Sequence, residues 1–200
     1  IFYFLQPGGA FIDTADPASA QATIVAILGN AGLGQVTSVV IPIGLLFFAF
    51  GAYALRANIG AGGNGNVLAG IGALFLYSGI VGWMIASGAG LAIAGTSLPA
   101  AQAVPVYGSL YGATVGIGTV SGILAGIGFL GLALAVSTRD DNNKMFALVA
   151  AAVAVVSIVV TILGALDDTQ LQTMGNITGI CYVIHMVWLI LVGRNLSQQG

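Results

Sequence analysis

The chain has 200 residues, of which 58% are hydrophobic and only 5% are charged. A soluble domain carries about 25% charged residues, so this composition excludes a water-facing globule. Four basic residues against six acidic ones leave no basic patch for nucleic acid, and the single cysteine, Cys181, excludes an internal disulfide and a cysteine-based metal cage. The composition predicts an integral membrane protein whose solvent is the lipid bilayer.

The chain opens on an apolar run, residues 1–5, and then enters a polar loop rich in proline and glycine. We expect the run to be the tail of a further membrane helix or a short interfacial anchor. Asp16 followed by Pro17 is typical of a helix start, with a carboxylate at the N-cap and proline at the first helical position. These two residues predict a short helix on the outer side over about 17–29.

Five apolar stretches follow, each long enough or nearly long enough to cross a hydrocarbon core, which needs about 20 residues. They cover about 35–56, 67–94, 108–136, 145–166 and 177–193. Pro42 predicts a kink in the first stretch, and the two prolines of residues 96–107 predict a loop before the third. We therefore predict an all-α polytopic transmembrane helical bundle, a single domain over residues 1–200, with five complete spans and a sixth that is truncated at the N-terminus.

The stretch 108–136 carries no charged residue, and its glycines recur on one side of the expected helix. In lipid such a helix persists because its backbone has no other hydrogen-bond partner, and small residues let a second helix approach closely. The stretch 67–94 has a comparable glycine pattern and is the predicted partner. The predicted helix-packing positions are Gly72, Gly79, Gly82, Gly90, Gly108, Gly112, Gly116, Gly122 and Gly126.

The loop charges predict an orientation. If each of the five stretches crosses once, one side of the membrane receives Arg56, Arg139, Lys144 and Arg194. The opposite side receives Asp13, Asp16, Asp167 and Asp168. Because basic residues favour the cytoplasmic side, we expect a cytoplasmic C-terminus, and we expect the membrane to be the cytoplasmic membrane of a bacterium.

No Asp, Glu, Lys or Arg is expected within the five spans. The exception among ionisable groups is His185, near the middle of the last span, which shares a helical face with Thr178, Cys181 and Trp188. Intramembrane ionisable residues often mark function, so His185 is a candidate cofactor-binding residue, an axial ligand for haem or a chlorophyll-type pigment. The structural alternative is a neutral histidine bonded to a hydroxyl or carbonyl group of a neighbouring helix. No acid lies within a span to orient a serine–histidine pair, so the sequence predicts no catalytic residue, no metal site and no enzyme.

Three functions are compatible with these features. The leading hypothesis is a non-catalytic structural or accessory subunit of a membrane complex or homo-oligomer, whose partners are the lipid bilayer and other membrane subunits or a second copy. The alternatives are a small-solute channel or facilitator lined by hydroxyl and carbonyl groups, and a haem- or pigment-binding subunit that uses His185.

Overall fold

The computed structural model describes residues 2–62, 65–139 and 143–197, and in these ranges every regular element is a helix. Five of the described helices are long and apolar enough to cross a membrane. This confirms the predicted all-α bundle with five membrane-length helices. Large apolar side chains such as Phe47 and Phe50 are more than two-thirds exposed on its outer surface, as lipid contact requires.

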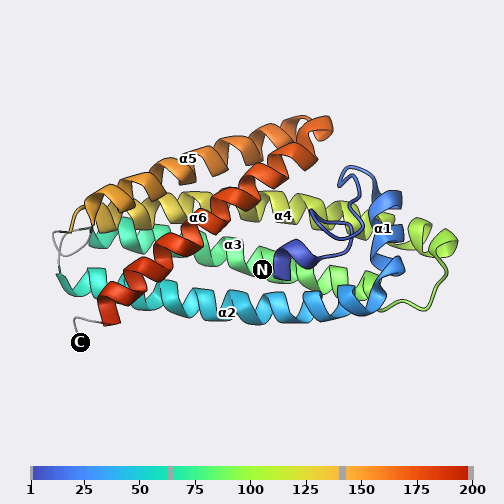
Figure 1. Ribbon diagram of the computed structural model, residues 1–200, viewed down its shortest axis with the longest axis horizontal. Coiled ribbons are helices and arrows are strands. Elements are labelled where there is room, and N and C mark those ends of the chain that lie inside the picture. The colour runs from blue at the N-terminus through green and yellow to red at the C-terminus, as the bar shows by residue number, and fades with distance from the viewer. Residues whose placement is uncertain (1, 63–64, 140–142, 198–200) are drawn as a thin grey trace.

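The helices follow one another with short connections. Their bounds are η1 (Phe2–Leu5), α1 (Ala20–Gly29), α2 (Ala31–Gly62), α3 (Asn66–Ala94), α4 (Ala100–Ser137), α5 (Lys144–Leu166), η2 (Asp168–Gln170) and α6 (Leu171–Ser197). Figure 1 shows α2, α3 and α4 running side by side along the bundle, each antiparallel to the next. The α5–α6 hairpin packs on α4, and α1 lies across one end.

The short helix predicted over about 17–29 begins later, at Ala20. Ser19, not Asp16, is the N-cap of α1, and its hydroxyl accepts a hydrogen bond from the Ala22 backbone N–H at 3.2 Å. The Asp16 carboxylate instead accepts from the Ala18 N–H at 2.9 Å and closes a turn before the helix. Both side chains are good caps, and the one next to the apolar positions starts the helix. Tyr111 of α4 fixes the turn by donating its hydroxyl to the Pro17 carbonyl at 2.9 Å.

The predicted loop over residues 96–107 is wrong, because α4 begins at Ala100 and continues through Pro105. α2 starts at Ala31, four residues before the predicted start, and continues through Pro42, where a kink was predicted. A proline removes one backbone hydrogen bond, but apolar surroundings make every other lost bond expensive, so the helix persists on both sides. At 38 residues α4 is about 57 Å long, nearly twice the hydrocarbon thickness of about 30 Å.

The centre of the bundle is built mainly from alanine and glycine, with a few large side chains. Leu76 of α3 and Phe129 and Leu132 of α4 are fully buried there, surrounded by alanines of α4 and α5. Small residues allow the helices to approach closely, which strengthens van der Waals packing in the absence of a hydrophobic driving force between helices in lipid.

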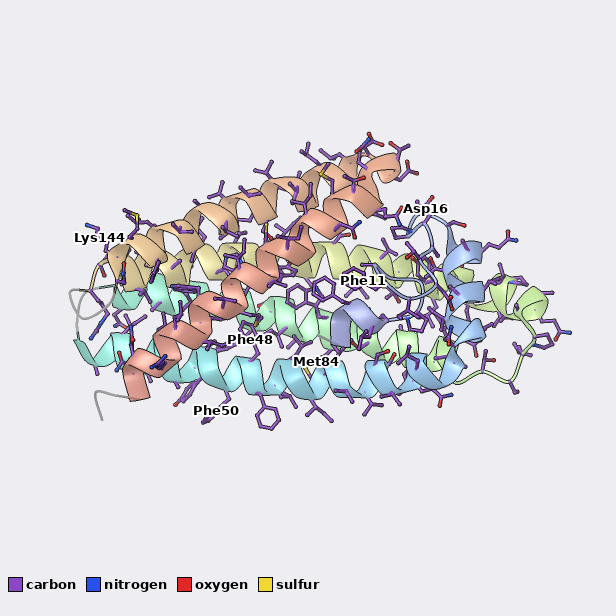
Figure 2. The ribbon with its side chains drawn as sticks, in the orientation of Figure 1. Phe11, Asp16, Phe48, Phe50, Met84 and Lys144 are labelled. Atoms are coloured by element: carbon purple, nitrogen blue, oxygen red, sulfur yellow. The ribbon has the colours of Figure 1, made fainter. Side chains whose placement is uncertain are left out.

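The charges separate along the bundle as the alternating spans require. The connections after α2 and α4 and the end of α6 lie at one end, with Arg56, Arg139, Lys144 and Arg194. Asp13, Asp16, Asp167 and Asp168 belong to loops and turns towards the other end. Figure 2 shows Lys144 and Asp16 at these opposite ends. We call them the basic end and the acidic end; Asp140 and Asp141 lie outside the described residues.

Candidate functional site

Helices α3 and α4 touch through their backbones at Gly72. A Cβ atom built on Gly72 would lie 2.7 Å from the Leu132 nitrogen and 2.9 Å from the Gly128 oxygen, closer than real Cβ contacts. A Cβ built on Gly131 would lie 2.8 Å from the Gly72 Cα. No side chain fits at either position, so glycine is required for this crossing.

The contact continues along α3 at two more of the predicted glycines. A Cβ on Gly79 would lie 2.6 Å from the Ser121 oxygen, and a Cβ on Gly82 would clash with the Ser121 hydroxyl. Gly90 faces a different neighbour, because the nearest atom to its built Cβ is the Ser38 hydroxyl of α2 at 3.2 Å. The α3 glycine pattern therefore serves two neighbours, α4 and α2.

The predicted pairing of α3 with α4 is confirmed, but the predicted glycine stripe of α4 is not the face that meets α3. Gly122 and Gly126 face the α5–α6 hairpin instead: a Cβ on Gly126 would lie 2.6 Å from Ile158 Cγ1, and one on Gly122 would lie 3.2 Å from the Tyr182 hydroxyl. The α3 side of α4 carries Gly128 and Gly131, which the sequence analysis missed. At 100° per residue these two fall on the opposite side of the helix from Gly126, and that pattern was the available signal.

The N-terminal half of the same stripe is uncovered. For Gly108, Gly112 and Gly116, no heavy atom of the described residues outside the local helix lies within 4 Å of a built Cβ. Gly108 and Gly126 are eighteen positions apart, about five helical turns, so they point to the same side of α4. Figure 1 shows α5 diverging from α4 before it reaches this half. We call Gly108, Gly112 and Gly116 the open glycine face.

His185 lies at the centre of the bundle and is fully buried. Its Nε2 atom is 3.1 Å from the Ala150 carbonyl oxygen of α5, which can only accept, so Nε2 donates. Its ring stacks on Phe129 of α4, with centroids 4.1 Å apart and planes 18° apart. This geometry matches the structural alternative predicted for His185, with a backbone carbonyl of a neighbouring helix as the partner.

The same contacts bear on the predicted haem or pigment ligand. An axial ligand must present a ring nitrogen lone pair to a metal, with room for a flat macrocycle beside it. At His185 the Nε2 proton points to the α5 backbone, and Phe129 covers a face of the ring. A macrocycle bound through Nε2 would have to displace both neighbours, whereas Nδ1 has no hydrogen-bond partner among the described residues, and the haem or pigment interpretation stays a prediction.

The hydroxyl groups near His185 bond mainly to backbone carbonyls. Thr161 donates to the Ser157 carbonyl at 2.7 Å, and Thr178 donates to the Met174 carbonyl at 2.9 Å. The two threonine hydroxyls approach each other to 3.3 Å across the α5–α6 contact. Back-bonding of this kind satisfies each hydroxyl within its own helix, and the Thr161–Thr178 contact is the one that joins α5 to α6.

The arrangement therefore contains a tightly packed glycine crossing, a buried histidine with a structural hydrogen bond, and one glycine face that the chain leaves uncovered. Comparison of the chain with models of known protein families, with curated proteins and with solved structures found no match.

Proposed function

We propose that the protein is a non-catalytic membrane subunit that associates through the open glycine face of α4 with a helix of a second copy. The single observation that carries the proposal is the contrast within one stripe of α4. Gly122 and Gly126 are covered by the α5–α6 hairpin, whereas a Cβ built on Gly108, Gly112 or Gly116, on the same side, has no atom of another described helix within 4 Å.

The free energy of the helix supports this reading. An exposed glycine in a helix costs about 1 kcal/mol relative to alanine, because it loses more backbone freedom on folding. At Gly72 or Gly126 that cost is offset by a contact that no larger residue could make. At Gly112 nothing within the chain offsets it, and a closely packed partner helix would do so.

The position of the open glycine face favours a second copy as the partner. Gly116 lies twenty-one residues from Ser137, about 32 Å along α4, so the face begins where the hydrocarbon core ends and continues beyond the acidic-end interface. The partner must therefore also extend beyond the bilayer at that side. α4 of a second copy has this length, and a two-fold axis would place Gly112 against its own equivalent.

Cross-linking in the membrane tests the proposal. In a Cys181→Ala background, Gly112→Cys is expected to form a disulfide-linked dimer on mild oxidation. Gly51→Cys is the matched control, because Gly51 is also exposed and open but lies on α2. No dimer with Gly112→Cys, or equal dimer with Gly51→Cys, would overturn the assigned face.

A second measurement separates a homodimer from a mixed complex. Fluorescence energy transfer between donor-labelled and acceptor-labelled copies is expected in proteoliposomes even when the protein is highly diluted in lipid. The Gly112→Leu side chain would block the close approach of the two helices, so this signal is expected to vanish in that variant. If energy transfer is absent, and a different membrane protein copurifies with the natural chain but not with Gly112→Leu, the partner is another subunit and the homodimer is wrong.

A further inference from the structure

Two fully buried polar atoms at the centre of the bundle have no hydrogen-bond partner among the described residues. They are the hydroxyl oxygen of Ser157 on α5 and the Nδ1 atom of His185 on α6, and both residues are 0% exposed. A polar atom that loses its bonds to water on burial costs about 1–3 kcal/mol unless a partner replaces them. Two such atoms on adjacent helices therefore indicate a ligand that satisfies both.

Ser157 departs from the pattern of other hydroxyl groups in these helices. Several serine and threonine side chains donate to the carbonyl oxygen four residues earlier, namely Thr37, Ser78, Thr114, Thr119, Ser121, Thr161 and Thr178. The same bond from Ser157 to the Val153 carbonyl is not formed. The Ser157 hydroxyl is therefore not satisfied by its own helix, and the Val153 carbonyl keeps the lone pair that such a bond would use.

The unpartnered ring nitrogen of His185 is a hydrogen-bond acceptor. The Nε2 atom donates to the Ala150 carbonyl at 3.1 Å, so in the neutral ring the proton is on Nε2 and Nδ1 carries a lone pair. The helices that contact the ring, α4, α5 and α6, contain no carboxylate that would favour the charged imidazole. Nδ1 therefore requires a hydrogen-bond donor.

Ser157 and the ring of His185 lie along the same side of α5. Ala150, which accepts the His185 bond, and Ser157 are seven residues apart, nearly two full turns and about 10.5 Å. Between them on this side α5 carries the buried Ala154, whose side chain is a single methyl group. The threonine contact described above lies one turn beyond Ser157 and keeps α5 and α6 in register there. The two polar atoms are thus neighbours across the α5–α6 contact, yet they form no bond with each other.

We propose that one water molecule is bound between Ser157 and His185 and links α5 to α6. The water donates one hydrogen bond to Nδ1 of His185, accepts one from the Ser157 hydroxyl and donates its second to the Val153 carbonyl. Buried waters typically make about three bonds of this kind to groups that would otherwise be unsatisfied. A single small ligand that both donates and accepts satisfies the two atoms together, which an apolar ligand cannot do.

This water site is separate from the α4 association and competes with the cofactor hypothesis. The open glycine face lies on the part of α4 beyond the α5–α6 hairpin, so the water can be bound whether or not two copies associate. A haem or pigment metal that bound through Nδ1 would use the lone pair to which the water donates. Bound water and a metal at this nitrogen therefore exclude each other.

His185 provides a direct reporter, because the chain has a single histidine and nitrogen-15 labelling gives one pair of ring signals. In solid-state NMR of the protein in lipid bilayers, magnetisation from water protons is expected to reach Nδ1. The Nδ1 signal is also expected at a lower chemical shift than that of an unbonded imine nitrogen, because it accepts a hydrogen bond. The Nε2 signal reports the bond to Ala150 and serves as the internal reference. The absence of either effect at Nδ1 would overturn the proposal.

Variants locate the water. Ser157→Ala removes one of its partners and is expected to reduce the transfer from water to Nδ1 severalfold while leaving the Nε2 signal in place. Ser121→Ala is the matched control, because Ser121 is also a buried serine but bonds to the Ile117 carbonyl of its own helix, and it is expected to change neither signal. Ser157→Val adds methyl groups where the water lies and is expected to abolish the transfer.

Two outcomes would contradict the assigned position. Transfer to Nδ1 that is as strong in Ser157→Ala and Ser157→Val as in the natural chain would show that the water is not held by Ser157. An equal loss in Ser121→Ala would show that the signal depends on the packing of the bundle as a whole.

Discussion

Gly72 of α3 and Gly131 of α4 lie so close that a Cβ atom added to Gly131 would be 2.8 Å from the Gly72 Cα. The two residues form the point where the central helices cross with backbone against backbone. Substitutions at this crossing should therefore act differently from substitutions at glycines of the same helix that face outwards.

The first prediction compares two glycines of α3. Gly72→Ala is expected to lower the free energy of unfolding by about 1–3 kcal/mol, because its methyl group would meet the α4 backbone, which cannot rotate away. Gly70→Ala is expected to be neutral or stabilising by up to about 1 kcal/mol, since no described atom lies near its built Cβ and alanine favours helix. Unfolding in mixed micelles measures both, and equal effects would contradict the assigned crossing.

The second prediction concerns the open glycine face. Gly112→Ala is expected to stabilise the monomer by up to about 1 kcal/mol, from helix propensity alone, while weakening association of the copies. A structural role within the monomer would instead make the substitution destabilising. Unfolding at a dilution where the protein is monomeric, and energy transfer at higher density, measure the two effects separately.

The third prediction concerns His185. His185→Phe is expected to keep the stacking on Phe129 and to lose about 0.5–1.5 kcal/mol of stability with the hydrogen bond to Ala150. His185→Ala is expected to lose about 2–4 kcal/mol, because it also leaves a cavity. The absorption spectrum of the natural protein is expected to match that of both variants above 350 nm, where haem absorbs strongly and protein does not. A visible band that disappears with His185→Ala would establish the cofactor hypothesis instead.

The fourth prediction concerns orientation. In a Cys181→Ala background, a membrane-impermeant maleimide is expected to label Asp167→Cys in intact cells and Asn195→Cys only after the membrane is opened. The reason is the position of Arg56, Arg139, Lys144 and Arg194 at one end of the bundle. Labelling of both positions in intact cells would contradict the odd number of crossings between them, and the reverse order would invert the orientation.

Much of the fold follows from apolar segment length, because a stretch of about 20 residues without charge can only be satisfied in lipid as a helix. The first and last residues of the helices were harder to predict from the sequence. Pro105 reads as a loop residue in water, yet α4 passes through it, and α6 begins at Leu171, six residues before the predicted span. Proline is a local turn signal, and here the apolar surroundings outweigh it because the helix must keep its remaining backbone hydrogen bonds.

The sequence predicted which glycines of α3 make close contacts, but not which helix each glycine face of α4 meets. Gly72 and Gly79 stand out by spacing, but spacing alone does not say which neighbour a face meets, and α4 has glycine on two sides. The contact among Val136, Phe146 and Trp188 could not be predicted, because these residues come from three helices and meet only through the angle between α5 and α6. That angle depends on the whole packing, not on a local pattern.

The unequal lengths of α4 and α5 make the protein sensitive to membrane thickness in one part only. α5 has 23 residues, about 35 Å, close to the hydrocarbon thickness, whereas α4 exceeds it by far. Thinning of the bilayer must then be absorbed by tilting of the α5–α6 hairpin, since α3 and α4 are held by touching backbones. The tilt of the hairpin relative to the α3–α4 pair would then change with bilayer thickness. This change in tilt would widen or narrow the space beside Trp188.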